Sequence, residues 1–155
     1  LLNDNGIKTT LHIVGIKNLD DEVAKLPFVD NIGFLNKNVP QEYKQLLNII
    51  SSCHCLLLPT KAECAGIAFS EASAFGLPIL TYNTGGISNY VIDGENGYAL
   101  PVNSTELDFY RKIEYCLKTG ILKEMSIKGL SLYRKKLNWD HFGEEVYNLI
   151  KSLLK

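Results

Sequence analysis

Two glutamates, Glu63 and Glu71, lie in a segment whose residue types suit the binding of a phosphorylated ligand. From Pro59 to Ala72 the chain leaves an apolar run, passes Gly66 and enters an alanine-rich stretch that predicts a helix. The first amides of a helix have no partners inside it and attract anions, while glycine permits close approach of a ligand to the backbone. The segment therefore predicts a phosphate site at a helix start, framed by two carboxylates.

The spacing of these carboxylates argues against a hydrolytic pair. Eight residues of helix span about 12 Å, whereas glycosidases hold their two carboxyl groups about 5 to 9.5 Å apart. A carboxylate also repels phosphate, so we expect Glu63 and Glu71 to accept hydrogen bonds from neutral hydroxyls, each worth about 1.5–3 kcal/mol. A ligand with hydroxyl groups on both sides of a phosphate matches the structure of a nucleotide sugar.

Alternating strands and helices are expected to position this segment. Apolar runs predict strands at residues 9–15, 31–35, 53–58, 77–82 and 97–100. Helical spacing predicts helices at residues 40–51, 66–75, 105–118, 122–135 and 140–154. Apolar strands alternating with helices specify an α/β fold, a Rossmann-like parallel sheet with helices on both faces and a helical C-terminal end. Such sheets bind ligands beyond the carboxyl ends of their strands, which directs attention to residues 60–76.

Composition limits the function classes. A chain of 155 residues fits one domain, and its 46% hydrophobic and 21% charged residues exclude disorder, collagen and coiled coil. The net charge of -1 supplies no field for holding nucleic acid or an anionic membrane. No apolar stretch approaches the roughly 20 residues of a membrane span.

The cysteines predict no metal site. Cys53 and Cys55 fall two apart in an apolar run, so we expect both in the core on one face of a strand. Cys64 and Cys116 fit no zinc-ligand spacing, and four scattered cysteines favour a reducing compartment.

Trp139 is expected to anchor the last helix by burying its ring.

An ordered series of motifs extends the pattern around the two glutamates. It comprises Glu63, Glu71-Ala72, Gly76-Leu77-Pro78, Gly85-Gly86-Ile87, Asp93-Gly94-Glu95-Asn96-Gly97 and a terminal helix after Trp139. From about residue 11 to residue 147 the chain resembles the carboxyl-terminal donor domain of retaining glycosyltransferases of the glycogen-synthase-like family, which has two Rossmann-like domains (the GT-B fold). Gly85-Gly86 is either a plain turn or a close-approach loop beside the donor.

The resemblance implies a role for each site residue. Glu71 would hold the ribose hydroxyls, and Glu63, the catalytic candidate, would hold the hydroxyls of the donor sugar. Phe34 and Leu35 would border the nucleobase. The sugar and diphosphate would be bound by the backbone around Cys64, Ala65, Gly66, Ile67, Ala68 and Phe69. No obligatory metal or other cofactor is implied.

The family transfers a hexose from a nucleoside diphosphate sugar to an acceptor hydroxyl with retained anomeric configuration. This implies a role in surface polysaccharide, lipopolysaccharide or glycoconjugate biosynthesis, in the cytoplasm or at the inner face of the membrane. The acceptor glycan or glycolipid would bind a separate amino-terminal domain. By the resemblance, that domain and the first strand of the donor domain precede Leu1, so residues 1–155 alone are expected to bind nucleotide weakly and to transfer no sugar.

Four positions depart from the family pattern. Cys64 and Ala65 stand where a glycine and an aromatic residue often follow the first glutamate, and Ser88 and Asn89 replace a proline and an acidic residue. These departures bear on the choice of sugar more than on the fold.

A non-catalytic nucleotide-binding or regulatory module is the alternative to a glycosyltransferase. A dehydrogenase is disfavoured because Gly15 is not followed by a dinucleotide-binding glycine series.

Overall fold

The computed structural model describes residues 1–64 and 66–154 and divides into two compact units, Leu1–Cys53 and His54–Lys155. Ala65, one of the residues assigned above to the sugar and diphosphate, lies outside the described residues. The assignment of the whole chain to one nucleotide-sugar domain stays a prediction.

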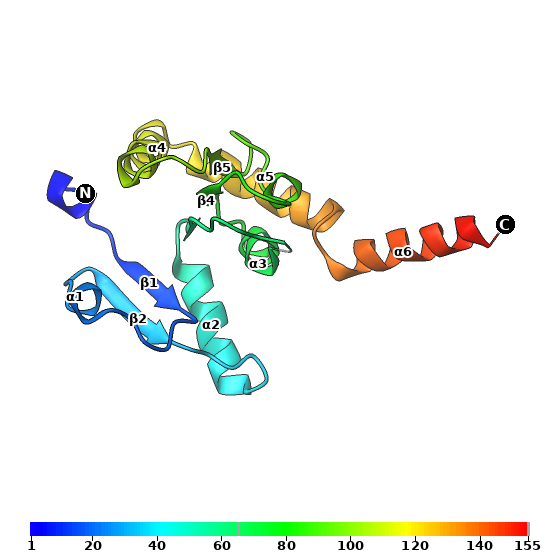
Figure 1. Ribbon diagram of the computed structural model, residues 1–155, viewed down its shortest axis with the longest axis horizontal. Helices are drawn as coiled ribbons and strands as arrows, with labels where there is room; N and C mark the ends of the chain where they lie inside the picture. The colour runs from blue at the N-terminus through cyan, green and yellow to red at the C-terminus, as the bar shows by residue number, and fades with distance from the viewer. Residues whose placement is uncertain (65, 155) are drawn as a thin grey trace. The chain divides into compact units, whose positions relative to one another are not determined.

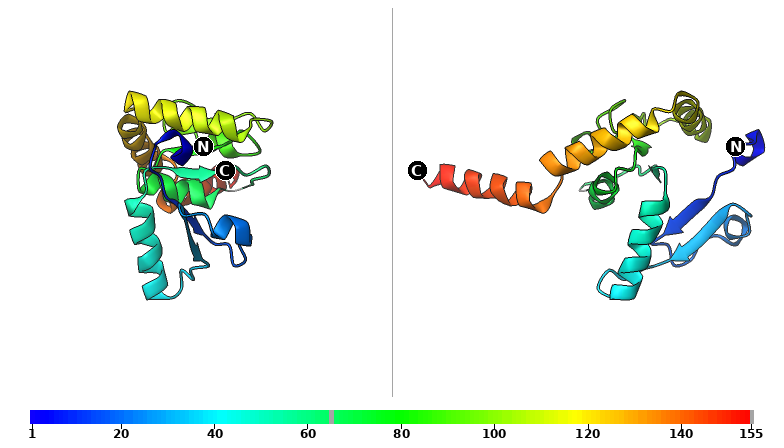
Figure 2. Two further views of the ribbon diagram at one scale, coloured as in Figure 1. Left: turned by 90° about the vertical axis from the view of Figure 1, so that its left-hand side faces the viewer. Right: turned by 180° about the vertical axis from the view of Figure 1, so that it is seen from behind.

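The first unit contains a pair of parallel strands with short helices. Its elements are η1 (Asn3–Asn5), β1 (Leu11–Val14), α1 (Asp21–Ala24), β2 (Val29–Gly33) and α2 (Pro40–Ser52). In the register of the two strands, Leu11 lies opposite Val29, and α1 packs beside β2 (Figure 2). The Asp20 carboxylate caps α1 by accepting a hydrogen bond of 2.9 Å from the amide of Glu22. This short helix was not predicted.

The second unit contains a three-stranded parallel sheet in the order β3-β4-β5. Its elements are β3 (Leu56–Leu58), α3 (Ile67–Ala74), β4 (Ile79–Tyr82), η2 (Ile87–Asn89), β5 (Gly97–Leu100), α4 (Glu106–Thr119), α5 (Leu122–Lys135) and α6 (Trp139–Leu153). Leu58 lies opposite Thr81, so the loops that follow β3 and β4 leave the same edge of the sheet. The helix α3 packs against α5 (Figure 1).

The core of the second unit lies around β4 and α3. Phe69, Ile79, Leu80 and Ile87 are each at most 1% exposed. Tyr98, Cys116 and Met125 form a further buried cluster that joins β5 to α4 and α5. The predicted α/β class, with parallel strands flanked by helices and a helical C-terminal end, is confirmed.

The predictions for two strands and two cysteines need correction. The strand predicted at residues 53–58 begins only at Leu56, because α2 continues to Ser52 and the Cys53 amide still bonds to the carbonyl of Ile50. Cys53 and Cys55 are therefore half-buried residues outside the strand and not core residues. The strand predicted at residues 31–35 is displaced, since β2 ends at Gly33, whose φ is +74°.

The prediction for Trp139 is also wrong. Its side chain is 77% exposed and meets the ring of Phe142 edge-on, with centroids 5.8 Å apart. Apolar residues of α6 such as Leu149, Ile150 and Leu153 are likewise more than half exposed, so the helix shows its apolar face to solvent. Among the described residues, no helix has the length and apolar character needed to cross a membrane.

Candidate functional site

The loop between β3 and α3 carries Glu63 and is shaped by its own hydrogen bonds. The Thr60 amide donates to the carbonyl of Leu58 at 2.8 Å, and the Thr60 hydroxyl donates to the carbonyl of Ala62 at 2.8 Å. The Glu63 carboxylate folds back and accepts a hydrogen bond of 3.1 Å from the amide of Cys64. Glu63 therefore lies at the carboxyl end of β3, half-buried, where a parallel sheet presents its ligand-binding loops.

The start of α3 offers backbone donors. The amides of Phe69 and Ser70 both donate to the carbonyl of Gly66, at 2.9 and 3.2 Å. The amides of Ile67 and Ala68 come before these first intrahelical bonds, and both residues are exposed. Among the described residues, α3 has no side-chain cap hydrogen bond and no acidic residue in its first turn.

Gly66 and Phe69 fit together at this helix start. A Cβ atom at Gly66 would lie 2.1 Å from Cδ2 of Phe69. The Phe69 ring is fully buried and lies 6.2 Å from the ring of Tyr90, centroid to centroid. Gly66 is thus required by the packing of Phe69, whose own amide is already bonded within the helix.

Glu71 lies in the second turn of α3 and is half-buried. It follows Ile67 by one turn and therefore shares a face with Ile67 and Ala68. Side chains on a helix tilt toward its amino-terminal end, which directs the Glu71 carboxylate toward the first turn. Helix geometry thus places Glu71 one turn from the start of α3, and its role at the ribose hydroxyls stays a prediction.

The loop after β4 lies directly against the loop that carries Glu63. The Thr84 hydroxyl donates to the carbonyl of Lys61 at 3.3 Å. A Cβ atom at Gly85 would lie 2.2 Å from the carbonyl oxygen of Glu63, and one at Gly86 would lie 3.2 Å from that of Cys64. The close approach at Gly85-Gly86 is therefore made to the protein's own backbone, and a position of this loop beside the donor stays a prediction. Thr84 was not among the predicted site residues, although neighbouring strands place their following loops together.

Phe34 and Leu35 belong to the first unit and follow β2. Phe34 is 58% exposed, and the Lys17 ammonium lies 5.5 Å from the centroid of its ring. Leu35 is half-buried. An exposed aromatic ring beside a cation is suited to stacking on a planar ligand, and the role of Phe34 and Leu35 at a nucleobase stays a prediction.

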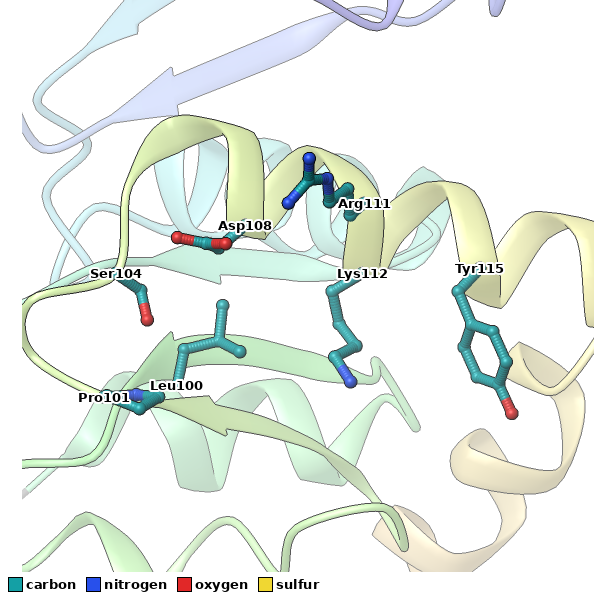
Figure 3. A pocket seen from close by; sticks show the side chains of 7 residues that line it. All are labelled: Leu100, Pro101, Ser104, Asp108, Arg111, Lys112 and Tyr115. Atoms are coloured by element: carbon teal, nitrogen blue, oxygen red, sulfur yellow. The ribbon is translucent and has the colours of Figure 1, made fainter.

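A pocket of about 410 Å³ lies elsewhere in the second unit. Figure 3 shows Asp108, Arg111, Lys112 and Tyr115 of α4 facing it together with the end of β5. The Lys112 ammonium lies 4.1 Å from the centroid of the buried Tyr98 ring, and burial raises the pKa of that phenol. This pocket shares no residue with the predicted donor site. Within the described residues, no cluster of three metal-ligating side chains is present.

The family model for glycosyl transferases group 1 matches residues 1–129. The chain belongs to this family. A curated relative, the alpha-1,3/1,6-mannosyltransferase ALG2 of Dictyostelium discoideum, is 27% identical over 97% of this chain and 34% of its own length.

Solved structures of glycosyltransferases with the GT-B fold share the architecture of this group 1 chain. The pneumococcal O-GlcNAc transferase GtfA in complex with UDP and GlcNAc matches 99% of the chain with a TM-score of 0.74 and 17% identity. HepE of Anabaena in complex with UDP matches 93% with a TM-score of 0.71 and 19% identity. The chain covers 31% and 41% of these two proteins, so it spans about a third of the length of its relatives.

Proposed function

We propose that this chain is the donor-binding half of a retaining glycosyltransferase that transfers a hexose from a nucleoside diphosphate sugar to an acceptor hydroxyl. One observation carries the proposal. Ile67 and Ala68, whose amides precede the first hydrogen bonds within α3, are exposed and lie one turn before Glu71, directly after the loop that carries Glu63. Membership of the group 1 family and the UDP complexes of two structural neighbours support the same assignment.

In this proposal each group binds the part of the donor that its chemistry suits. The amides at the start of α3 receive the diphosphate, since a helix amino terminus stabilises an anion by about 0.3–2 kcal/mol. Glu71 accepts hydrogen bonds from the two ribose hydroxyls, and Glu63 accepts from the hydroxyls of the donor sugar. Neither carboxylate then faces phosphate, which avoids repulsion between like charges.

The remaining features of the activity follow from the family resemblance. The acceptor, a glycan or glycolipid, binds a domain outside this chain, and no metal is required for transfer. The product is a surface polysaccharide, lipopolysaccharide or other glycoconjugate. Transfer takes place in the cytoplasm or at the inner face of the membrane, where nucleotide sugars are made, with peripheral attachment of the full-length protein.

Calorimetric titration of the full-length protein with UDP, GDP and ADP tests the assignment. We expect one nucleotide to bind, and Glu71→Gln to raise its Kd about 10- to 150-fold, as loss of one charged hydrogen bond of about 1.5–3 kcal/mol requires. Glu144→Gln, on the exposed surface of α6, is the matched control and leaves Kd unchanged.

Two results would contradict the proposal: no nucleotide binds the wild-type protein, or Glu71→Gln binds as tightly as wild type. Nucleotide binding without any transfer to a panel of glycan and lipid acceptors would instead identify the non-catalytic module.

A further inference from the structure

We propose that Thr84, Gly85 and Gly86 form a clamp that fixes the backbone of residues 61–64 and thereby positions Glu63 for sugar transfer. This inference rests on the proposed function, because Glu63 acts on the donor sugar only in that reaction. The clamp contains no group that touches substrate in this proposal, so its three members are positioning residues.

The contacts of the clamp lie along residues 61–64 of the loop that carries Glu63. The Thr84 hydroxyl holds the carbonyl of Lys61 at 3.3 Å. Gly85 lies so close to the carbonyl of Glu63 that no side chain fits between them, and Gly86 approaches the carbonyl of Cys64. Three successive residues of one loop therefore contact three of the four residues from Lys61 to Cys64 in the other.

The clamp itself has a rigid base in η2. Ile87 is fully buried, and its amide donates to the carbonyl of Thr84 at 3.2 Å. Asn89 holds the carbonyl of Gly86 twice, through its backbone amide at 3.1 Å and its side-chain Nδ2 at 3.2 Å. Asn89 stands where the family often has an acidic residue, and an ionised carboxylate could not donate this side-chain bond. Motion of the clamp relative to the core is thus restricted.

The helix α3 is anchored by different contacts. Phe69, Ala72 and Ser73 are buried, and the helix packs against α5. Loss of the clamp should therefore displace Glu63 while leaving Glu71 and the amides of α3 in place. The expected signature is a fall in turnover with little change in nucleotide affinity, which general destabilisation would not produce.

Gly85→Ala in the full-length protein tests the clamp, with Gly94→Ala as its matched control. Both glycines have positive φ, +52° and +76°, so both variants carry similar backbone strain. Only Gly85 has backbone within reach of the new methyl group, since nothing lies within 4 Å of a Cβ at Gly94. We expect Gly85→Ala to lower kcat/KM about 100-fold, the effect of a displacement near 1 Å, with the nucleotide Kd within about threefold. Gly94→Ala should retain both values.

Thr84→Val and Thr84→Ser provide a milder test. Removal of one neutral hydrogen bond, worth about 0.5–1.5 kcal/mol, should lower kcat about 2- to 10-fold in Thr84→Val, and Thr84→Ser should restore it. Hydrogen exchange of the amides of residues 61–64 is expected to accelerate in Gly85→Ala and Thr84→Val alone.

The clamp is refuted if Gly85→Ala matches wild type in kcat/KM and in exchange of the loop, or if Gly94→Ala loses as much activity as Gly85→Ala. If the wild-type protein transfers no sugar, the proposed function fails. Hydrogen exchange then still shows whether Thr84 and Gly85 hold the loop, so the two failures are distinguishable.

Discussion

Replacement of Gly66 by alanine should destabilise the second unit through a collision with one buried ring. The new methyl group would lie 2.1 Å from Cδ2 of Phe69, and the ring cannot move aside because it is fully buried against Tyr90. Overpacking of this kind costs about 1–3 kcal/mol, and so short a separation favours the upper end. The φ of Gly66 is -74°, which alanine adopts without strain. Alanine also makes the unfolded chain stiffer, which stabilises the folded state by about 0.4–1 kcal/mol. The expected net loss in the free energy of unfolding is therefore about 2 kcal/mol.

A double-mutant cycle isolates this collision. Phe69→Leu removes the ring, so Gly66→Ala should cost almost nothing in that background, which gives a coupling free energy of about 2 kcal/mol. Urea titrations of the wild type, both single variants and the double variant, followed by circular dichroism, supply the four free energies of unfolding. Gly143→Ala is the control, because α6 leaves open space around Gly143 and alanine favours a helix. Additive effects of the two substitutions would refute the packing argument.

Two further predictions concern polar groups outside the donor site. Asn96 is 1% exposed and bonds through its side chain to the amide of Ile92 and the carbonyl of Tyr90, each at 2.8 Å, so Asn96→Ala should lower the free energy of unfolding by about 2–3 kcal/mol in urea titrations. A loss below about 1 kcal/mol would contradict this. Hydrogen bonds from the amide and hydroxyl of Thr105 hold the pKa of Asp108 below its ordinary value of 3.8. The folded state therefore favours the carboxylate, so the Tm advantage of wild type over Asp108→Asn should be present above that value and disappear as the pH falls through the lowered pKa. An advantage that does not shrink as the pH falls below 3.8 would refute it.

The elements that could be predicted best have strong local signals. The helix at residues 122–135 was predicted with the observed bounds because its apolar residues repeat at helical spacing. The prediction of a strand at residues 97–100 was also correct, since turn residues precede this strand and Pro101 follows it. Both predictions rest on information that lies within a few residues of the element.

Other features depend on contacts that a local pattern does not contain. The apolar run at residues 53–58 does not reveal that α2 extends to Ser52 and delays the strand to Leu56. The large aromatic side chain of Trp139 predicts burial. Burial also requires a partner surface that the sequence does not reveal, and in the structure this side chain is 77% exposed. The bond between Thr84 and Lys61 joins residues that are far apart in sequence, and it exists because β3 and β4 are neighbours.

The glycines of the recognised motifs illustrate the same limit at the candidate site. Glycine in a phosphate-binding motif is readily interpreted as room for a ligand. Here the space beside three glycines is occupied by the protein itself. Gly66 lies against the Phe69 ring, Gly85 lies against the carbonyl of Glu63, and Gly97 lies against the carbonyl of Ile79. Substitution of these glycines would thus impair packing whether or not a donor binds. Evidence for nucleotide-sugar binding must come from Glu71, whose carboxylate is not needed for any of these close approaches, which is why its conservative replacement by glutamine decides the proposed function.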